Sequence, residues 1–127
     1  IGRAESDFMD KCKLDLGDIY LLKNEPWESP LLYSQVEKSQ RETPLGHEAK
    51  LRNARQYYYT GDFELSKALL DILKMATSRE IANDAGSLSL LIQDNTGLDT
   101  SEDAMKEYAS IDLLLYQNQT ELALGRL

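Results

Sequence analysis

The chain has 127 residues, of which 42% are hydrophobic and 28% are charged, a composition typical of a single globular domain. Its formal net charge of −8 argues against nucleic-acid binding, because neutralising phosphates requires clustered Lys and Arg. No apolar run is long enough to span a bilayer, so direct membrane insertion is not expected, and the single Cys excludes an internal disulfide.

Turn and capping residues divide the chain into segments whose apolar residues follow helical spacing. Prolines follow Glu25 and Thr43, and a proline suits the first helical turn because its missing N–H is not needed there. Gly61 is suited to end one helix with a positive φ, and Asp62 is suited to cap the next. We therefore predict helices over 3–22, 26–41, 44–59, 62–76, 78–93, 100–117 and from 120 onward.

The clearest helical hairpin carries small and large residues at positions that suit close packing. We expect the small Ala54 to let the two helices approach, with Tyr57 filling the space beside it. Ser66 is the small residue expected on the facing helix. Leu70 and Leu73 are expected to seal this hairpin against the next one.

The same pattern occurs 37 residues earlier in the chain. Gly17 stands in the small position there, and Ser29, Tyr33 and Val36 take the corresponding positions on the second helix. A further copy is expected near the end of the chain. The helix over 100–117 fits either as the second helix of a third repeat or as the first helix of a fourth.

This arrangement resembles the tetratricopeptide repeat (TPR) family, whose helix–turn–helix unit has about 34 residues. The resemblance implies an all-α fold, with antiparallel helical hairpins stacked as a right-handed solenoid of about three to four repeats in one domain over residues 1–127. Lys13 and Lys50 replace the tryptophan common in the family. Segments 27–33, 76–78 and 81–85 are similar to large bacterial repeat proteins, which implies a longer parent chain in the cell envelope or periplasm.

An aromatic run near the end of the 44–59 helix is the main candidate for a binding surface. By the repeat register Tyr57 is a core residue, whereas Tyr58 and Tyr59 take positions that in the TPR family often line the concave surface. Tyrosine and arginine are also enriched at binding hot spots. The predicted partner-binding residues are Glu48, Leu51, Arg52, Arg55, Tyr58 and Tyr59. The alternative is that these tyrosines pack against adjoining helices as ordinary core residues.

Nothing in the sequence indicates catalysis, a cofactor or a metal site. We expect His47 to be exposed and Cys12 to be a small buried hydrophobe, so that they do not form a catalytic pair. Asp15 and Asp18 are expected on a solvated face. The acidic residues between 94 and 103 lack the spacing of an EF-hand loop.

The predicted function is therefore binding, not enzymatic activity. We expect a protein–protein interaction scaffold that holds a partner peptide or protein on its concave helical surface. A basic or neutral partner suits the acidic chain. The alternative is a small-molecule or glycan-binding helical module of a bacterial envelope protein, although nearly continuous helix leaves little room for ligand loops.

Overall fold

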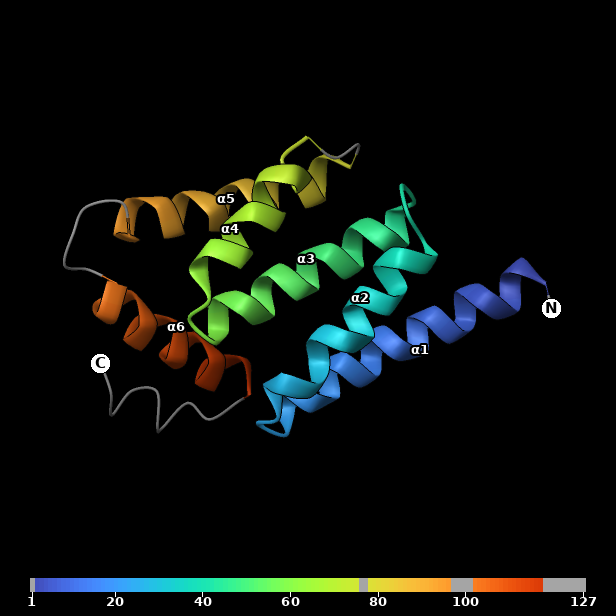
Figure 1. Cartoon of the computed structure of the whole chain (residues 1–127), viewed down its shortest axis with the longest axis horizontal. Helices are drawn as coiled ribbons and strands as arrows, with labels where there is room; N and C mark the ends of the chain where they lie inside the picture. The colour runs from blue at the N-terminus through green and yellow to red at the C-terminus, as the bar shows by residue number, and fades with distance from the viewer. Residues whose placement is uncertain (1, 76–77, 97–101, 118–127) are drawn as a thin grey trace.

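The computed structural model describes residues 2–75, 78–96 and 102–117 of the chain (Figure 1). The helices are α1 (Arg3–Leu22), the 3₁₀ turn η1 (Pro26–Glu28), α2 (Ser29–Ser39), α3 (Pro44–Tyr59), α4 (Phe63–Leu73), α5 (Arg79–Thr96) and α6 (Glu102–Tyr116). The predicted all-α fold class is confirmed, since these residues contain no strand. The helix predicted from residue 120 onward lies outside the described residues.

The helix ends follow from local chemistry at the turns. Thr43 precedes α3 and its hydroxyl accepts a hydrogen bond from the Gly46 N–H at 3.2 Å, as expected for an N-cap. Gly61 has a φ of 85° and ends α3, as predicted, whereas the side chain of Asp62 makes no capping hydrogen bond. Asn24, 37 residues before Gly61, also has a positive φ of 63°, so the two corresponding turns use the same backbone conformation.

Several predicted boundaries differ from the structure; for example, the helix expected over 62–76 is α4, which spans Phe63–Leu73. The segment predicted as one helix over 26–41 is a 3₁₀ turn followed by α2. The fifth helix was predicted to end at residue 93 but continues to Thr96. The side chains of its last residues hydrogen-bond to backbone carbonyls one turn earlier in the helix. The Asn95 amide donates to the Leu91 carbonyl and the Thr96 hydroxyl donates to the Ile92 carbonyl, each at 2.7 Å.

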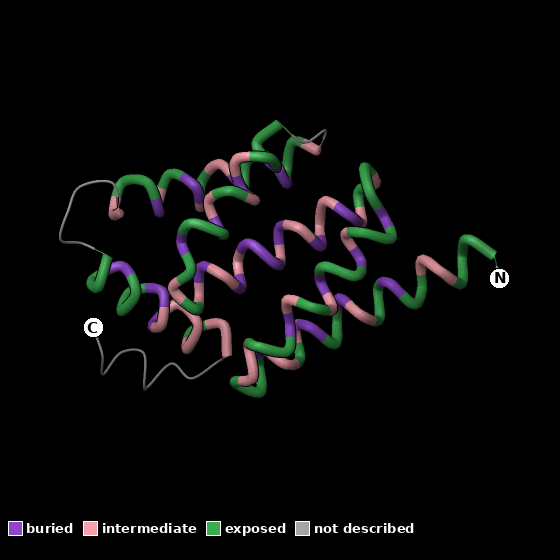
Figure 2. Tube along the Cα trace, in the orientation of Figure 1, coloured by how far each residue is buried: buried purple, intermediate pink, exposed green. Residues whose placement is uncertain are grey.

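The first five α-helices each pack on the next along the chain, and α3 lies at the centre (Figure 1). Buried positions recur along the whole of α3 (Figure 2). Helix α6 departs from this order, because it contacts α3 as well as α5. Just after α6, Gln117 Nε2 donates to the Leu21 carbonyl oxygen at 2.8 Å, which ties α6 to the end of α1. Within the described ranges no helix combines the length and the apolar character needed to cross a bilayer.

The two complete hairpins, α1–α2 and α3–α4, repeat one buried contact. The Ser29 hydroxyl donates to the Gly17 carbonyl at 2.7 Å, and the Ser66 hydroxyl donates to the Ala54 carbonyl at the same distance. Both bonds are buried, and corresponding partners lie 37 residues apart. The predicted small-residue contacts are therefore present in both hairpins, and the sequence repeat is also a structural repeat.

Several predictions of burial were wrong. Tyr57, predicted to be a core residue, is half-buried, whereas Tyr58 is only 2% exposed, which agrees with the alternative that it packs as a core residue. The reason is α6, which crosses the end of α3 and covers Tyr58. Cys12 is exposed on a face of α1 that no described helix covers. His47 is half-buried, and its Nδ1 atom is buried without a hydrogen-bond partner among the described residues.

Candidate binding groove

A groove with a volume of about 600 Å³ opens between α5 and α6, with α3 as its floor. Four of the six predicted binding residues line it: Leu51, Arg55, Tyr58 and Tyr59. Leu88 and Leu91 on α5 and Leu115 and Tyr116 on α6 form the apolar part of its walls, and Asp84, Ser87 and Asp112 are the polar residues among them. We call this hollow the α3 groove. It lies over the aromatic end of α3 that the sequence singled out.

The tyrosines of α3 hold the α6 wall in place. The Tyr58 hydroxyl donates to Asp112 Oδ2 at 2.6 Å, and the rings of Tyr59 and Tyr116 lie 5.7 Å apart between centroids. Burial raises the pKa of Tyr58 above its ordinary value and raises the pKa of Tyr59 to about 12. Both phenols therefore keep their protons at neutral pH. The Tyr58 hydroxyl already donates its proton in the hydrogen bond to Asp112.

Arg55 is the cation of the α3 groove. It lies where this groove meets a smaller hollow of about 180 Å³, and it lines both. Its guanidinium makes no hydrogen bond or ion pair with any residue that the structure describes. Because a guanidinium offers five N–H donors in a planar fork, Arg55 is available to bind an anionic group.

Arg52, by contrast, is bound within the protein. Its Nη1 lies 2.9 Å from Asp18 Oδ2 and 3.8 Å from Asp15 Oδ1, and its Nε lies 3.0 Å from Glu48 Oε1. Tyr33 completes the network by donating its hydroxyl to Asp18 Oδ1 at 2.6 Å. The Asp18 side chain is 29% exposed and lies within this network, not on the solvated face predicted for it, and its burial raises the pKa of the carboxyl.

This network connects α1, α2 and α3 beside the α3 groove. Glu48 and Arg52 line the smaller hollow and not the groove itself. The six predicted residues therefore separate into two sets. One set lines an open groove, and the other forms an internal ion-pair network that joins three helices.

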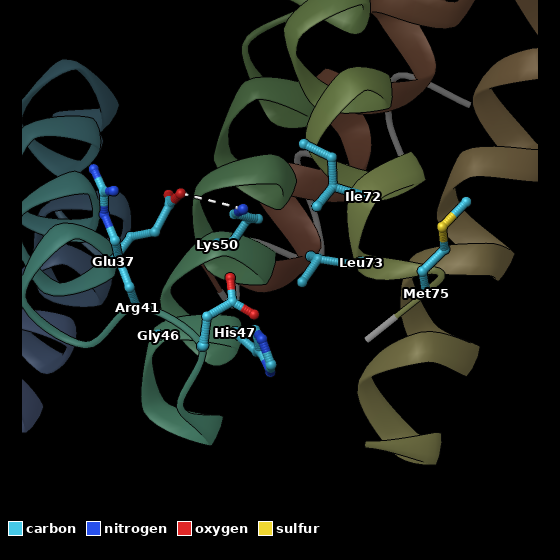
Figure 3. A pocket seen from close by; sticks show the side chains of 9 residues that line it. Glu37, Arg41, Gly46, His47, Lys50, Ile72, Leu73 and Met75 are labelled. Carbon is cyan, nitrogen blue, oxygen red and sulfur yellow. Dashed lines mark ion pairs between the residues drawn. The ribbon is translucent and has the colours of Figure 1, made fainter. Parts of the chain in front are cut away.

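A separate hollow of about 310 Å³ lies between the α2–α3 turn and the end of α4 (Figure 3). Lys50 Nζ lies 3.3 Å from Glu37 Oε1 on one side, and Ile72 and Leu73 point into the hollow from α4 (Figure 3). The charged residues around it balance: Glu37 and Glu42 against Arg41 and Lys50. No part of this lining selects one class of ligand.

The α5 and α6 walls of the α3 groove could not be recognised in the sequence. Leu88, Leu91 and Leu115 are spaced like any core leucines. Leu88 and Leu91 reach the groove because α5 contacts α3, and Leu115 reaches it because α6 folds back over α3, where the Tyr58–Asp112 bond joins residues 54 positions apart. No short-range sequence signal marks that contact.

No protein-family model, curated protein or solved structure matches the chain. Among the described residues, no group of three or more His, Cys, Asp or Glu side chains is placed to hold a metal ion. The α3 groove is therefore the candidate site on geometric grounds, because it combines leucine side chains, aromatic rings, two carboxylates and the unbonded Arg55.

Proposed function

We propose that the chain is a TPR-like scaffold for protein interaction and that the α3 groove receives a segment of a partner protein. The 37-residue repetition of the buried serine contact supports the repeat architecture. In that architecture α1, α3 and α5 are the first helices of successive units, and the contacts of α3 with both of the others fit this assignment. The groove then lies on the first-helix side, where the partner was predicted to bind.

The observation that carries the proposal is the unbonded Arg55 beside apolar walls. An aliphatic or aromatic side chain of a partner would enter between Leu91 and Leu115, where burial removes apolar surface from water. A carboxylate close to that side chain would bind Arg55 through paired N–H donors. The proposed ligand is therefore a peptide segment in which an apolar residue stands near an acidic residue or a C-terminus.

A glycan fits this groove less well than a peptide. Sugar hydroxyls need many directed hydrogen bonds, whereas leucines make up much of the walls. Of the polar residues in the lining, Asp112 already accepts the Tyr58 hydroxyl, which leaves Asp84, Ser87 and Arg55 to bind sugar hydroxyls. The open and mainly apolar lining favours a peptide.

Selection from a random peptide display library on the immobilised chain tests the proposal, followed by calorimetry on the selected peptides. We expect peptides that combine an apolar and an acidic residue. Arg55→Ala should weaken their binding about tenfold or more, because a charged hydrogen bond is lost.

Arg41→Ala is the matched control, since Arg41 is an exposed arginine of the other hollow and should not affect binding. Tyr59→Ala should also weaken binding, and because the Tyr59 ring contacts Tyr116 of the α6 wall, circular dichroism and urea unfolding are measured on the same variant to separate lost binding from lost stability. Selected peptides that bind the Arg55→Ala and Tyr59→Ala variants as tightly as the parent would place binding elsewhere. Failure to select any peptide would contradict the proposed function.

A further inference from the structure

A stripe of exposed apolar side chains runs along α1. Phe8 is 68% exposed, Met9 56%, Leu16 41% and Ile19 47%, and Cys12 is also exposed between them. Single exposed apolar residues are ordinary, but five on one helical face form a continuous surface. The groove residues come from α3, α5 and α6, so this α1 stripe is separate from the α3 groove.

The repeat register identifies the α1 stripe as a helix-packing face. Moving 37 residues along the chain takes Cys12, Leu16 and Ile19 to Ala49, Asn53 and Gln56. All three of these α3 residues are buried, and Asn53 bonds Ser34 of α2. Another helix thus covers this face of α3, whereas no described helix covers the corresponding face of α1.

Charges at the two ends of the stripe indicate what would cover it. Glu5 and Lys23 are 18 residues apart, about five helical turns, so they lie on the same side of α1 as the stripe. Both are exposed, and neither makes an ion pair with a described residue. A helix with an apolar middle, an acid at one end and a base at the other is complementary to an antiparallel copy of itself.

We propose that α1 docks against α1 of a second copy of this chain in an antiparallel, two-fold symmetric dimer. Opposite directions bring Glu5 against Lys23 of the second copy and Lys23 against its Glu5. Met9 then meets Ile19, and Cys12 meets Leu16, in the apolar middle. A parallel pair would instead place like charges together at both ends. Two-fold symmetry is the commonest arrangement of homo-oligomers.

Sedimentation velocity over a concentration series, under reducing conditions, tests this dimer. The chain is expected to pass from monomer to dimer as its concentration rises. Leu16→Glu places a charge in the apolar middle and should weaken the dimer about a hundredfold. The matched control is Leu65→Glu, which adds the same charge at an exposed leucine of α4 and should leave the dimer unchanged.

Charge reversal tests the antiparallel direction. Glu5→Lys alone and Lys23→Glu alone should each weaken the dimer about tenfold, because each creates two like-charge contacts. The double variant should regain the affinity of the parent, since it exchanges the two charges. Both residues are exposed, so none of these variants should alter the helical circular dichroism signal. A chain that stays monomeric throughout, or a double variant as weak as the single ones, would overturn the proposal.

Discussion

Hairpins α1–α2 and α3–α4 share one plan but fill their interiors with side chains of different size. In the first, Gly17 takes the small position and Tyr33 the large one; in the second, the same positions hold Ala54 and Leu70. A Cβ added to Gly17 would lie 2.6 Å from Tyr33 Cε1. The large Tyr33 therefore fits only beside a glycine, whereas the smaller Leu70 leaves room for an alanine. The residue at the small position and the residue at the large position must change together to fill the same space.

The largest expected effect comes from overfilling the second hairpin. Ala54 is fully buried at the α3–α4 contact, so Ala54→Leu should destabilise the chain by about 3 kcal/mol. Urea unfolding followed by circular dichroism measures this. Ala68→Leu, at an exposed alanine of α4, is the control and should change stability by less than about 0.5 kcal/mol. An unchanged unfolding midpoint for Ala54→Leu would show that the proposed register is wrong.

A somewhat smaller loss is expected when the glycine of the first hairpin becomes alanine. Gly17→Ala should cost about 2 kcal/mol, because the clash with Tyr33 exceeds the gain of about 1 kcal/mol in helix propensity. Adding Tyr33→Leu recreates the pairing of the second hairpin and should recover part of that loss. Adding Tyr33→Phe instead keeps the aromatic ring and should not recover the lost stability. If Tyr33→Leu changes the urea midpoint equally in the parent and in the Gly17→Ala variant, the two positions are not coupled.

The shared serine contact predicts equal effects in the two hairpins. Ser29→Ala and Ser66→Ala each remove the donor to a buried carbonyl, so each should cost about 1 kcal/mol. Ser110→Ala removes an exposed bond to the Glu107 carbonyl and should cost almost nothing. Urea midpoints of the three variants make the comparison. A clear difference between the two buried serines would mean that the hairpins are not energetically equivalent.

The smallest effect concerns alkaline pH and Tyr59, a residue of the second hairpin that lines the α3 groove. Burial raises the pKa of Tyr59 to about 12, compared with about 10 in an unfolded chain. The folded state therefore holds this proton more tightly. The contribution of this proton to the free energy of unfolding is fully present below about pH 10, and it is lost as the pH rises from 10 towards 12. Tyr59→Phe should make the fall in urea midpoint over this range shallower, and a fall as steep as in the parent would contradict this.

The features predicted correctly depend on residues close together in the sequence. Thr43 before its proline and Gly61 with its positive φ act within a single turn. The small residues Gly17 and Ala54 were recognisable because the pattern around them recurs at a fixed interval. Such signals specify helices and their nearest partners.

The errors arose where distant segments meet. Arg52 is one of the predicted partner-binding residues, but its guanidinium is bound by Asp18, 34 residues away. For Tyr58 the sequence leaves two alternatives, a binding surface or the core, and only the crossing of α6 over α3 explains why it is buried. Cys12 shows a different limit, because helical spacing identifies an apolar face without showing whether anything covers that face.

The bond between Gln117 and the Leu21 carbonyl has a consequence for the order of folding. It joins residues 96 positions apart, whereas the two serine contacts each span 12. Contacts between sequence neighbours form quickly, and contacts that close long chain segments form slowly. Helices α1 to α5 can therefore assemble one after another, with α6 joining last. The α3 groove would gain its second wall only at that final step, and hydrogen exchange should find the amides of α6 less protected than those of α3.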